Sequence, residues 1–559
     1  MMLLMLSVSV LVVAGMVNGS GHALHSSTEQ MQQLQRSEVS MVNNIRMLVT
    51  DIDRLNNVLK GYIDSWEEVS ELLEEESVSD PSLAYKLLKH VSEGWPKVDS
   101  ALMTHTHISD IMDHLSKRAD EELLPNSDDV MGASEALIKL SLIYRVNATA
   151  LAQGHLQTEQ DSHTHISNTL PLSVSELASI GLVGINKGHL GIGVEFLQAA
   201  RTQAVAQQGL KQQKSLRNED TYTPQKLDGL IKTAVRVHDH VLELRGERSL
   251  THSTASRPLG TGVSGKLKIS SDIQAKDSPD SIIGTHYLQL HTNETWMLKE
   301  KDIVEIKQTE KLCRGEDLRP IRELSTLFCQ YMTGNHPWLL LAPFKVEVIS
   351  RQPYITVIYD LITASEAESL WNYTAEGLHT PNHPMMKKNE NSTKIDWSLK
   401  NQWVNESDQP QLKQVTQRIE ALANVRAGQQ HSRPYMVANY GLGGAYTPHM
   451  DTFGPFGITQ DRLYGERLAT AMIYLQAPKS GGNTVFPWVG AGIRPVNFAG
   501  VLWWNLLDSH EYDFLTKHAA CPILRGTKWI ANKWISYKPQ WPGRNCPKDA
   551  AKRITQPNI

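Results

Sequence analysis

The apolar residues of the N-terminal segment recur in alternating steps of three and four positions. This spacing is kept over more than four heptads and predicts a coiled coil, in which a partner helix covers the apolar stripe. Glu38 interrupts one of the core positions. The alternative is a long amphipathic helix that packs against its own domain. The stripe consists of Met31, Leu34, Met41, Ile45, Leu48, Ile52, Leu55, Leu59 and Tyr62.

Further helical patterns follow along the N-terminal half of the chain. Residues 80–95 and 135–152 are predicted to be helices. Residues 173–204 predict a helix, a glycine-containing turn and a second helix. Such a pair resembles a tetratricopeptide repeat, although no clear second copy follows at a 34-residue period. Residues 227–245 give one more helix, so the N-terminal half is expected to be all-helical.

The hydrophobic pattern changes to short β-rich runs after about residue 353. Runs such as ITVIYDLI, RPYMVANY, ATAMIYLQ and KWIANKWISY are separated by glycine and proline. Short strands with turn signals favour a closed or two-sheet β structure, and we expect a double-stranded β-helix, or jelly roll. The predicted units are a helical N-terminal dimerisation domain (24–170), a tetratricopeptide-like domain (171–248), a linker (249–344) and a C-terminal β domain (345–559).

Composition narrows the class of protein. The chain has 559 residues, of which 40% are hydrophobic, so several domains can each bury a core. A formal net charge of -5 leaves no basic surplus to neutralise a phosphate backbone. We therefore expect no nucleic-acid partner.

The N-terminus predicts export from the cytosol. Its apolar run is about 13 residues long and is followed by small residues. This run is too short for a membrane span and suits a signal peptide, which we place at residues 1–19. Later in the chain, no stretch approaches the roughly 18 apolar residues that a transmembrane helix needs. The mature chain is expected in a secretory compartment without a membrane span.

The four cysteines and the glycosylation sequons agree with an oxidising lumen. Cys313 with Cys329, and Cys521 with Cys546, form two local pairs whose short loops predict two disulfides. Neither pair has the close spacing of zinc ligands. Sequons for N-glycosylation occur at Asn147, Asn293, Asn372, Asn391 and Asn405.

One histidine among 22 is followed two residues later by an aspartate, in the run YGLGGAYTPHMD that ends at Asp451. Residues two apart on an extended segment face the same way, so His449 and Asp451 can bind one metal ion together. The candidate third ligand is His518, which would complete the two-histidine, one-carboxylate site of non-haem iron(II) oxygenases. Lys528, ten residues later, is a cation suited to an acidic co-substrate.

Three blocks of this chain resemble a known family, the α subunits of collagen prolyl 4-hydroxylase. They are YGLGGAYTPHMD, GGNTVFP and HAACPILRGTKWIANKW. The resemblance extends upstream through KLCRGE and, more loosely, DPSLAYKLLKHVSEGW. It implies an iron(II) and 2-oxoglutarate dioxygenase of the endoplasmic reticulum lumen, whose tetratricopeptide-like domain binds the peptide substrate.

The resemblance also assigns roles to individual residues. His449, Asp451 and His518 match the iron ligands. Lys528 matches the salt-bridge partner of the distal carboxylate of 2-oxoglutarate, and Tyr440 and Thr484 match groups that hydrogen-bond the same carboxylate. Three further positions match places that face the peptide in relatives, although a purely structural role is the alternative for each. These three are Tyr446, Arg467 and Trp534.

The family implies a reaction and an assembly. Proline in X-Pro-Gly sequences of procollagen would be 4-hydroxylated with dioxygen and 2-oxoglutarate, giving succinate and carbon dioxide, and ascorbate would rescue oxidised iron. The assembly would be an α2β2 tetramer with protein disulfide isomerase as the β subunit. Two alternatives stay open: a luminal dioxygenase that acts on a non-collagen proline-rich protein, and an inactive scaffold subunit that binds procollagen.

Overall fold

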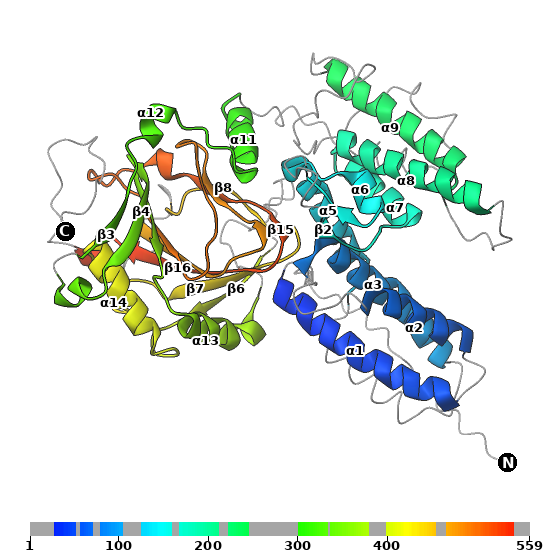
Figure 1. Ribbon diagram of the computed structural model, residues 1–559, viewed down its shortest axis with the longest axis horizontal. Coiled ribbons are helices and arrows are strands. Elements are labelled where there is room, and N and C mark those ends of the chain that lie inside the picture. The colour runs from blue at the N-terminus through cyan, green and yellow to red at the C-terminus, as the bar shows by residue number, and fades with distance from the viewer. Residues whose placement is uncertain are drawn as a thin grey trace.

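Helices form most of the N-terminal part of the molecule and β-sheets form the C-terminal part in the computed structural model (Figure 1). The N-terminal half is not all-helical as expected, because β1 (His155–Leu156) and β2 (Ser167–Asn168) form a short antiparallel pair within it. Two helices, α13 (Ala364–Thr374) and α14 (Leu412–Ala423), lie against the outer side of the larger sheet. The structure describes residues 27–51, 56–70, 79–103, 125–158, 167–211, 222–244, 300–333, 336–379, 399–453 and 465–540. The predicted signal peptide lies outside these residues.

The N-terminal helices pack against one another along the chain. Helix α5 begins after Asn126, whose side-chain oxygen accepts from the N–H groups of Asp128 and Asp129, which satisfies donors that the first turn leaves unpaired. Helix α7 begins in the same way after Ser173. The described helices of this region are α1 (Thr28–Asp51), α2 (Asn56–Ser70), α3 (Pro81–Met103), α5 (Ser127–Tyr144), α6 (Ala148–Ala152), α7 (Val174–Asn186), α8 (Leu190–Lys211) and α9 (Pro224–Leu244).

The apolar stripe of the first helices is covered by the same chain. Its described members are buried in one core with residues of α3 such as Leu87 and Val91. For the described members of the stripe, the expected partner helix from a second chain is therefore wrong, and the alternative of an amphipathic helix folded on its own domain is confirmed. Pairing of two such chains through other surfaces stays a prediction. The described stripe residues are Met31, Leu34, Met41, Ile45, Leu59 and Tyr62, and Leu48, Ile52 and Leu55 lie outside the described side chains.

The next three helices, α7, α8 and α9, pack in chain order. The crossing of α7 and α8 is close because glycines face each other there. A Cβ atom on Gly193 would lie 2.7 Å from the carbonyl oxygen of Gly181, so a larger residue would push the helices apart. The predicted helix, turn and helix are thus confirmed, whereas the likeness to a tetratricopeptide repeat stays a prediction.

The C-terminal part is built on a sheet of eight strands in the order β3-β4-β5-β13-β9-β16-β7-β6, with antiparallel neighbours throughout. Successive residues along these strands point to opposite faces, and both faces are largely apolar. This is expected of a sheet that is covered on both sides. The strands are β3 (Cys329–Met332), β4 (Phe344–Arg351), β5 (Tyr354–Tyr359), β6 (Leu399–Val404), β7 (Tyr435–Tyr440), β9 (Arg467–Gln476), β13 (Gly500–Trp504) and β16 (Lys528–Ser536).

A second, four-stranded antiparallel sheet in the order β12-β11-β14-β8 faces the first. Tyr474 of the large sheet and Phe486 of the small sheet share the core between them. The opposite face of the large sheet packs on α13 (Ala364–Thr374) and α14 (Leu412–Ala423). The small-sheet strands are β8 (Tyr446–His449), β11 (Thr484–Phe486), β12 (Ala491–Ile493) and β14 (His518–Ala520). Two antiparallel sheets around a shared interior were predicted from the strand pattern.

The segment expected to be a linker is partly folded onto these sheets. Helix α11 (Glu300–Cys313) packs against β11 and β12, and β3 is the first strand of the large sheet. The described part of this segment therefore belongs to the β region, and the predicted boundary at residue 344 is too late. Residues 249–299, which contain the serine- and glycine-rich stretch, lie outside the described residues.

The predicted pairing of Cys313 with Cys329 is wrong, because Cys313 is bonded to Cys521. Helix α11 ends beside the small sheet, where Cys521 directly follows β14. Cys329 is a free, exposed thiol on β3, at the edge of the other sheet. Closeness in sequence favours a pair only weakly, since the entropy of closing a loop grows slowly with its length. Cys546 lies outside the described residues, so the predicted bridge from Cys521 to Cys546 is also replaced.

Contacts between the helical and β parts are polar as well as apolar. The Tyr144 hydroxyl at the end of α5 donates to the carbonyl of Pro522 at 2.5 Å. Ser27 and Thr28 at the start of α1 donate to Asn439 of β7 at 2.9 and 3.0 Å. Leu442 and Leu524 of the β part belong to the same apolar core as the N-terminal helices. The N-terminal helices thus pack directly against the outer surface of the β part.

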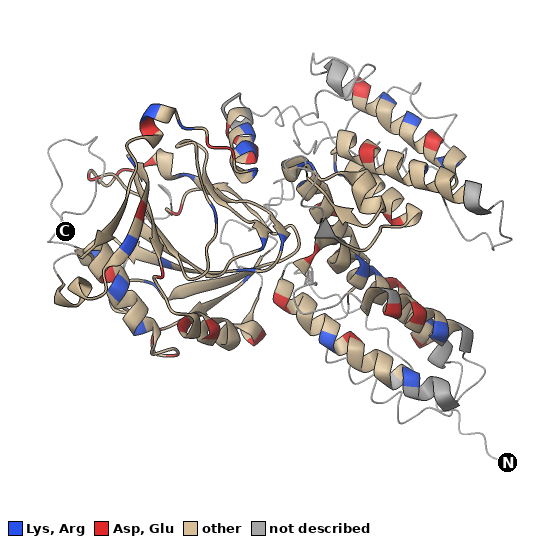
Figure 2. Cartoon of the chain, in the orientation of Figure 1, with Lys and Arg blue, Asp and Glu red and all other residues tan. Residues whose placement is uncertain are grey.

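Charged residues of both signs are interspersed along the helices, while the strands carry few (Figure 2).

The glycosylation sequons differ in exposure. Asn147 and Asn372 are exposed and Asn405 is half-buried, while Asn293 and Asn391 lie outside the described residues. Glycosylation at the five sequons stays a prediction. In the described portion of the chain, none of the helices combines the length and apolar character that crossing a membrane requires.

Candidate active site

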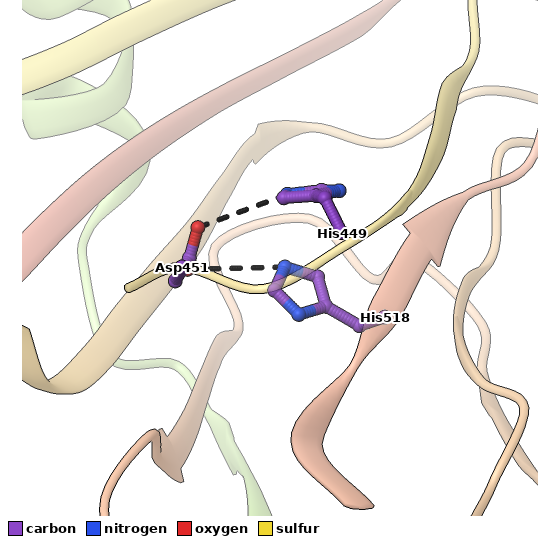
Figure 3. A group of neighbouring side chains, drawn as sticks. All are labelled: His449, Asp451 and His518. Carbon is purple, nitrogen blue, oxygen red and sulfur yellow. Dashed lines mark ion pairs between the residues drawn. The ribbon is translucent and has the colours of Figure 1, made fainter. Parts of the chain in front are cut away.

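Two histidines and one aspartate meet between the sheets, as Figure 3 shows. His449 is the last residue of β8 and His518 the first of β14, and the two are directly paired across the ladder. Asp451 follows β8 by two residues. The pairing is irregular, since three residue steps on β8 oppose two on β14. Such a bulge re-aims side chains next to active sites, and Pro448, which lacks a backbone N–H, lies within it.

The three side chains have the geometry of ligands to one ion. Their ligand atoms all lie within 4.8 Å of one another. Among the residues that the structure describes, no other group of three histidine, cysteine or acidic side chains comes this close together. His449 Nε2 is 3.7 Å from one oxygen of Asp451, and His518 Nε2 is 3.8 Å from the other. Both separations are too long for hydrogen bonds. The predicted triad is therefore brought together.

The ring nitrogens that do not face the centre are held by the backbone. His449 Nδ1 donates to the carbonyl of Thr447 at 2.8 Å, and His518 Nδ1 donates to the carbonyl of Thr516 at 3.0 Å. A carbonyl only accepts, so each Nδ1 carries the proton and each Nε2 has a free lone pair. Both acceptors lie two residues before their histidine, Thr447 within β8 and Thr516 in the short 3-10 helix before β14, so each ligand is oriented by the backbone next to it.

Asp451 is fixed by a second layer of contacts. The Thr470 hydroxyl on β9 donates to its carboxylate at 2.7 Å, and Asn505 donates to Thr470 at 3.0 Å. Arg467 donates to the backbone carbonyl of Asp451 at 3.2 Å. Sequence analysis missed Thr470 and Asn505, although the alternation along β9 places Thr470 on the same face as Tyr474.

The surroundings set the protonation of His449 and Asp451 in favour of metal binding. Burial, together with the neighbouring His518, lowers the pKa of His449 to about 3. Burial by itself would raise the pKa of Asp451, but His518, His449 and Arg467 outweigh it and hold that pKa below its usual value. A neutral imidazole and a carboxylate are the forms that coordinate a metal. The residues therefore fit a divalent ion such as iron(II).

Lys528 is buried at the start of β16, where it faces the interior between the two sheets. Its Nζ donates to the carbonyl of Gly482 at 2.6 Å and lies over the rings of Tyr440 and Tyr474, at 5.1 and 5.6 Å from their centroids. Burial lowers the pKa of Lys528 to about 7. A buried ammonium without a carboxylate beside it is costly, so this site favours an anionic ligand.

The groups around Lys528 include both predicted partners and one that was missed. Tyr440 is paired with Lys528 across β7 and β16. Thr484 is buried on β11, and its hydroxyl is 2.8 Å from that of Tyr474. Tyr474 is therefore a third hydroxyl-bearing residue beside Lys528, in addition to the predicted Tyr440 and Thr484. Its signal in the sequence was the alternation along β9, which gives it the same face as Thr470.

The three positions expected near a peptide lie close to the triad, directly or through one another. The ring of Tyr446 lies 3.9 Å from that of His449, and burial raises its pKa. The Arg467 guanidinium lies over the Trp534 ring at 3.9 Å from its centroid and over the Phe453 ring at 4.5 Å. Burial lowers the pKa of Arg467 to about 10. Tyr446 and Arg467 therefore contact the triad, and Trp534 contacts Arg467, while the role of all three toward a peptide stays a prediction.

Comparison with known proteins identifies two domains. Residues 27–158 match the N-terminal region of the prolyl 4-hydroxylase alpha-subunit, and residues 435–536 match the 2OG-Fe(II) oxygenase superfamily. The chain is 29% identical to prolyl 4-hydroxylase subunit alpha-2 of Gallus gallus over 525 residues, which cover 91% of this chain and 92% of the relative. It is 27% identical to subunit alpha-1 of Homo sapiens over 547 residues, covering 93% and 95%.

The comparison with solved structures gives partial alignments. Viral collagen prolyl hydroxylase from Paramecium Bursaria Chlorella virus-1, in complex with 2OG, is 24% identical. It aligns with 32% of this chain and 94% of its own length, at a TM-score of 0.25.

Proposed function

Since residues 27–158 match the N-terminal region of the prolyl 4-hydroxylase alpha-subunit and residues 435–536 match the 2OG-Fe(II) oxygenase superfamily, we propose that this chain is the catalytic subunit of a procollagen-proline 4-dioxygenase. The reaction is 4-hydroxylation of proline in X-Pro-Gly sequences with dioxygen and 2-oxoglutarate. The observation that carries this proposal is the convergence of His449, Asp451 and His518, with free Nε2 atoms, beside the buried cation Lys528.

The triad would hold iron(II) through His449 Nε2, His518 Nε2 and the Asp451 carboxylate. When bound, iron(II) supplies the oxygen-activating chemistry that converts 2-oxoglutarate to succinate and carbon dioxide and proline to hydroxyproline. The protein keeps the ligands fixed. The backbone carbonyls of Thr447 and Thr516 orient the imidazoles, and Thr470 orients the carboxylate.

Lys528 would bind the distal carboxylate of 2-oxoglutarate. A dicarboxylate leaves water at a large desolvation penalty, which a buried cation and hydroxyl donors offset. Tyr440 and Thr484 supply such donors, and Tyr474, whose hydroxyl contacts that of Thr484, supports them. The aromatic rings around the ammonium exclude water from the ion pair.

The peptide would reach the triad on the side of Tyr446, Arg467 and Trp534. Arg467 links this side to the triad because it donates to the Asp451 carbonyl while its guanidinium lies over the Trp534 ring. These groups bind and orient the proline that reacts. Their buried, aromatic surroundings suit an apolar proline ring.

The remaining features of the proposal rest on the family. The β region would be a jelly roll, and helices α7 to α9 within residues 171–248 would be a tetratricopeptide-like domain for the peptide. The chain would work in the endoplasmic reticulum lumen, with ascorbate, in an α2β2 tetramer with protein disulfide isomerase. The free, exposed Cys329 and the Cys313–Cys521 bridge are compatible with a thiol-exchanging partner.

The test is turnover by the full chain, co-expressed with protein disulfide isomerase and supplied with iron(II) and ascorbate. Decarboxylation of 2-oxoglutarate should rise strongly when a Pro-Pro-Gly repeat peptide is added, and mass spectrometry should find hydroxyproline in that peptide. Turnover with another proline-rich protein but not with this peptide would favour the non-collagen alternative. Peptide binding without any decarboxylation would identify a scaffold subunit.

A further inference from the structure

Strand β6 carries a partly exposed tryptophan next to the peptide side of the candidate active site. Trp403 is 40% exposed. Leu399, on the same strand, belongs to the core between the two sheets, and side chains two apart share a face. Leu399, Asn401 and Trp403 therefore point toward the interior that holds the triad, with Trp403 at the outer end of the row.

Trp403 is connected to the triad by an unbroken series of contacts. Its ring centroid lies 5.7 Å from that of Trp534, with the planes tilted by 43°. The Arg467 guanidinium lies 3.9 Å from the Trp534 ring centroid and donates to the carbonyl of Asp451 at 3.2 Å. An aromatic and cationic surface thus runs from the exterior to the metal-binding residues.

Three polar atoms on the same face have no hydrogen-bond partner among the residues that the structure describes. They are Oδ1 of Asn401, Oδ1 of Asn532 and Nε1 of Trp534. Asn401 and Trp534 are each only 5% exposed. Strand register places Asn532 in one row with Met436 and Trp403, across β16, β7 and β6. Buried polar groups are almost always paired in folded proteins, so a donor and two acceptors gathered here point to a ligand that supplies their partners.

An extended proline-containing peptide has the matching chemistry. A polyproline II segment makes no internal hydrogen bonds, so its carbonyl and N–H groups are free along its length. Aromatic-lined grooves recognise such segments because proline rings pack on flat aromatic faces. Proline has no backbone N–H. In an X-Pro-Gly sequence the backbone N–H of the glycine is therefore the nearest donor that follows the proline.

We propose that Trp403, Asn401 and Asn532 form a second peptide subsite, which binds the residues that flank the reacting proline. This proposal rests on the proposed function. A flanking proline ring packs on Trp403, Asn532 and Asn401 accept peptide N–H groups, and Trp534 donates to a peptide carbonyl. Trp403 and Asn532 are specificity-determining residues, since they contact substrate away from the reacting atoms.

Trp403→Ala in the full chain, co-expressed with its partner subunit, tests the aromatic contact. The KM for a long Pro-Pro-Gly repeat should rise by about threefold to tenfold, the range of one aromatic contact. The KM for 2-oxoglutarate should stay within a factor of two. For a single blocked Pro-Pro-Gly unit, kcat/KM should be nearly unchanged, because that peptide is too short to reach the subsite. Trp403→Phe should recover most of the affinity for the long repeat.

The matched control is Trp338→Ala. Trp338 is exposed to a similar extent, 44%, but it contacts His336 and Phe344 at the other end of the large sheet. Its loss should change neither peptide constant. The subsite is refuted if Trp403→Ala leaves the KM for the long repeat unchanged, or if it weakens long and short peptides equally.

Asn532 provides a second variant, independent of the fold of β6. Asn532→Ala should raise the KM for the long repeat several-fold, whereas Asn532→Asp, which keeps an acceptor oxygen, should retain more of the affinity. Equal effects of the two changes would overturn the assigned role as an acceptor. If the unmodified enzyme hydroxylates no proline peptide at all, the proposed function fails and the subsite with it. That result differs from an active enzyme that is indifferent to Trp403.

Discussion

The helical and β parts of the molecule each bury a carboxylate beside histidine. In the helices, Glu38 lies against His90, whose Nε2 is 2.8 Å from a carboxylate oxygen. In the β part, Asp451 lies against His449 and His518. The two clusters contain similar residues, yet their contacts differ.

The helical cluster is closed by hydrogen bonds. The Tyr62 hydroxyl donates to Glu38, His90 Nε2 contacts the same carboxylate oxygen, and His90 Nδ1 is 2.9 Å from the Ser65 hydroxyl. In contrast, both Nε2 atoms of the β cluster lie beyond hydrogen-bonding distance of Asp451. A buried acid next to histidine is therefore no mark of a metal site. The distinguishing feature is an imidazole whose Nδ1 is engaged while its Nε2 lone pair faces the other ligands.

The largest expected effect is loss of turnover when a ligand of the β cluster is removed. His518→Ala should lower kcat by at least about 100-fold, more than the loss of an outer-shell partner produces, because two ligands do not hold iron(II) in a defined geometry. Iron content per chain after gel filtration, measured by mass spectrometry, should fall in parallel. Activity near wild type would remove His518 from the triad and leave the two clusters equivalent.

Lys528 should give the next largest effect, confined to the co-substrate. Lys528→Ala leaves a bound dicarboxylate without its cation, and an unpaired buried charge costs about 1–3 kcal/mol or more. The KM for 2-oxoglutarate should therefore rise about 10- to 100-fold, with little change in the KM for peptide. A change in the peptide constant alone would show that Lys528 faces substrate instead.

The pH dependence of that KM should report the same lysine. Burial lowers the pKa of Lys528 to about 7 in the free site, whereas a bound carboxylate favours the charged form and raises it. Above pH 7, binding then requires uptake of a proton, so the KM for 2-oxoglutarate should rise by up to about tenfold per pH unit. Below pH 7 this dependence should vanish. Lys528→Ala should lack it at every pH, and a wild-type KM that is flat from pH 7 to 8.5 would contradict the assignment.

Breaking the helical cluster should affect stability and spare catalysis. Glu38→Ala removes the oxygen that accepts from the Tyr62 hydroxyl and contacts His90 Nε2, so both groups lose their partner. The free energy of unfolding of the helical part should fall by about 1–3 kcal/mol. Thermal unfolding should show this as a lower Tm, while kcat and both KM values stay near wild type. Loss of turnover at an unchanged Tm would mean that the two clusters share a function.

The smallest effect should come from a contact that joins the two parts. The Pro522 carbonyl accepts from the Tyr144 hydroxyl at 2.5 Å and from the Gly482 N–H at 2.9 Å, and the Gly482 carbonyl accepts from Lys528. Tyr144→Phe removes the first of these bonds, worth about 0.5–1.5 kcal/mol. The KM for 2-oxoglutarate should rise by about twofold to tenfold, with kcat unchanged.

Tyr85→Phe is the control for that change. Tyr85 is a buried tyrosine of α3 whose hydroxyl contacts Ser134 within the helices. Its loss should lower the Tm without moving the KM for 2-oxoglutarate. If both variants raise this KM equally, the effect reflects general loosening of the helices and Tyr144 has no positioning role.

The sequence predicted the triad and Lys528 because their information is local. His449 and Asp451 share a short extended run, and the resemblance placed His518 and Lys528 at fixed positions on two further strands. The sequence did not identify Tyr474 and Thr470 because their role depends on which strand of the large sheet faces Thr484 and Asp451 across the interior. Alternation along β9 gives their common face, but only the strand order shows what that face meets.

Two predictions failed for a related reason. The heptad stripe showed that α1 and α2 need an apolar partner, yet periodicity does not say whether that partner is a second chain or α3 of the same chain. The cysteine pairs were chosen by closeness along the sequence, whereas helix α11 returns to the small sheet and brings Cys313 to Cys521. Both outcomes are set by tertiary packing, which local patterns do not contain.

The direct pairing of His449 with His518 makes strand alignment a condition for activity. A slip of β14 by one residue would keep most of its backbone hydrogen bonds but turn His518 to the opposite face. Such a molecule would have ordinary secondary structure and no complete triad. The Cys313–Cys521 bridge, attached one residue beyond β14, holds that strand against lengthwise sliding. The amount of iron bound per chain would thus report the fraction of molecules with the correct strand register. Circular dichroism would not detect this fraction, because it reports secondary structure alone.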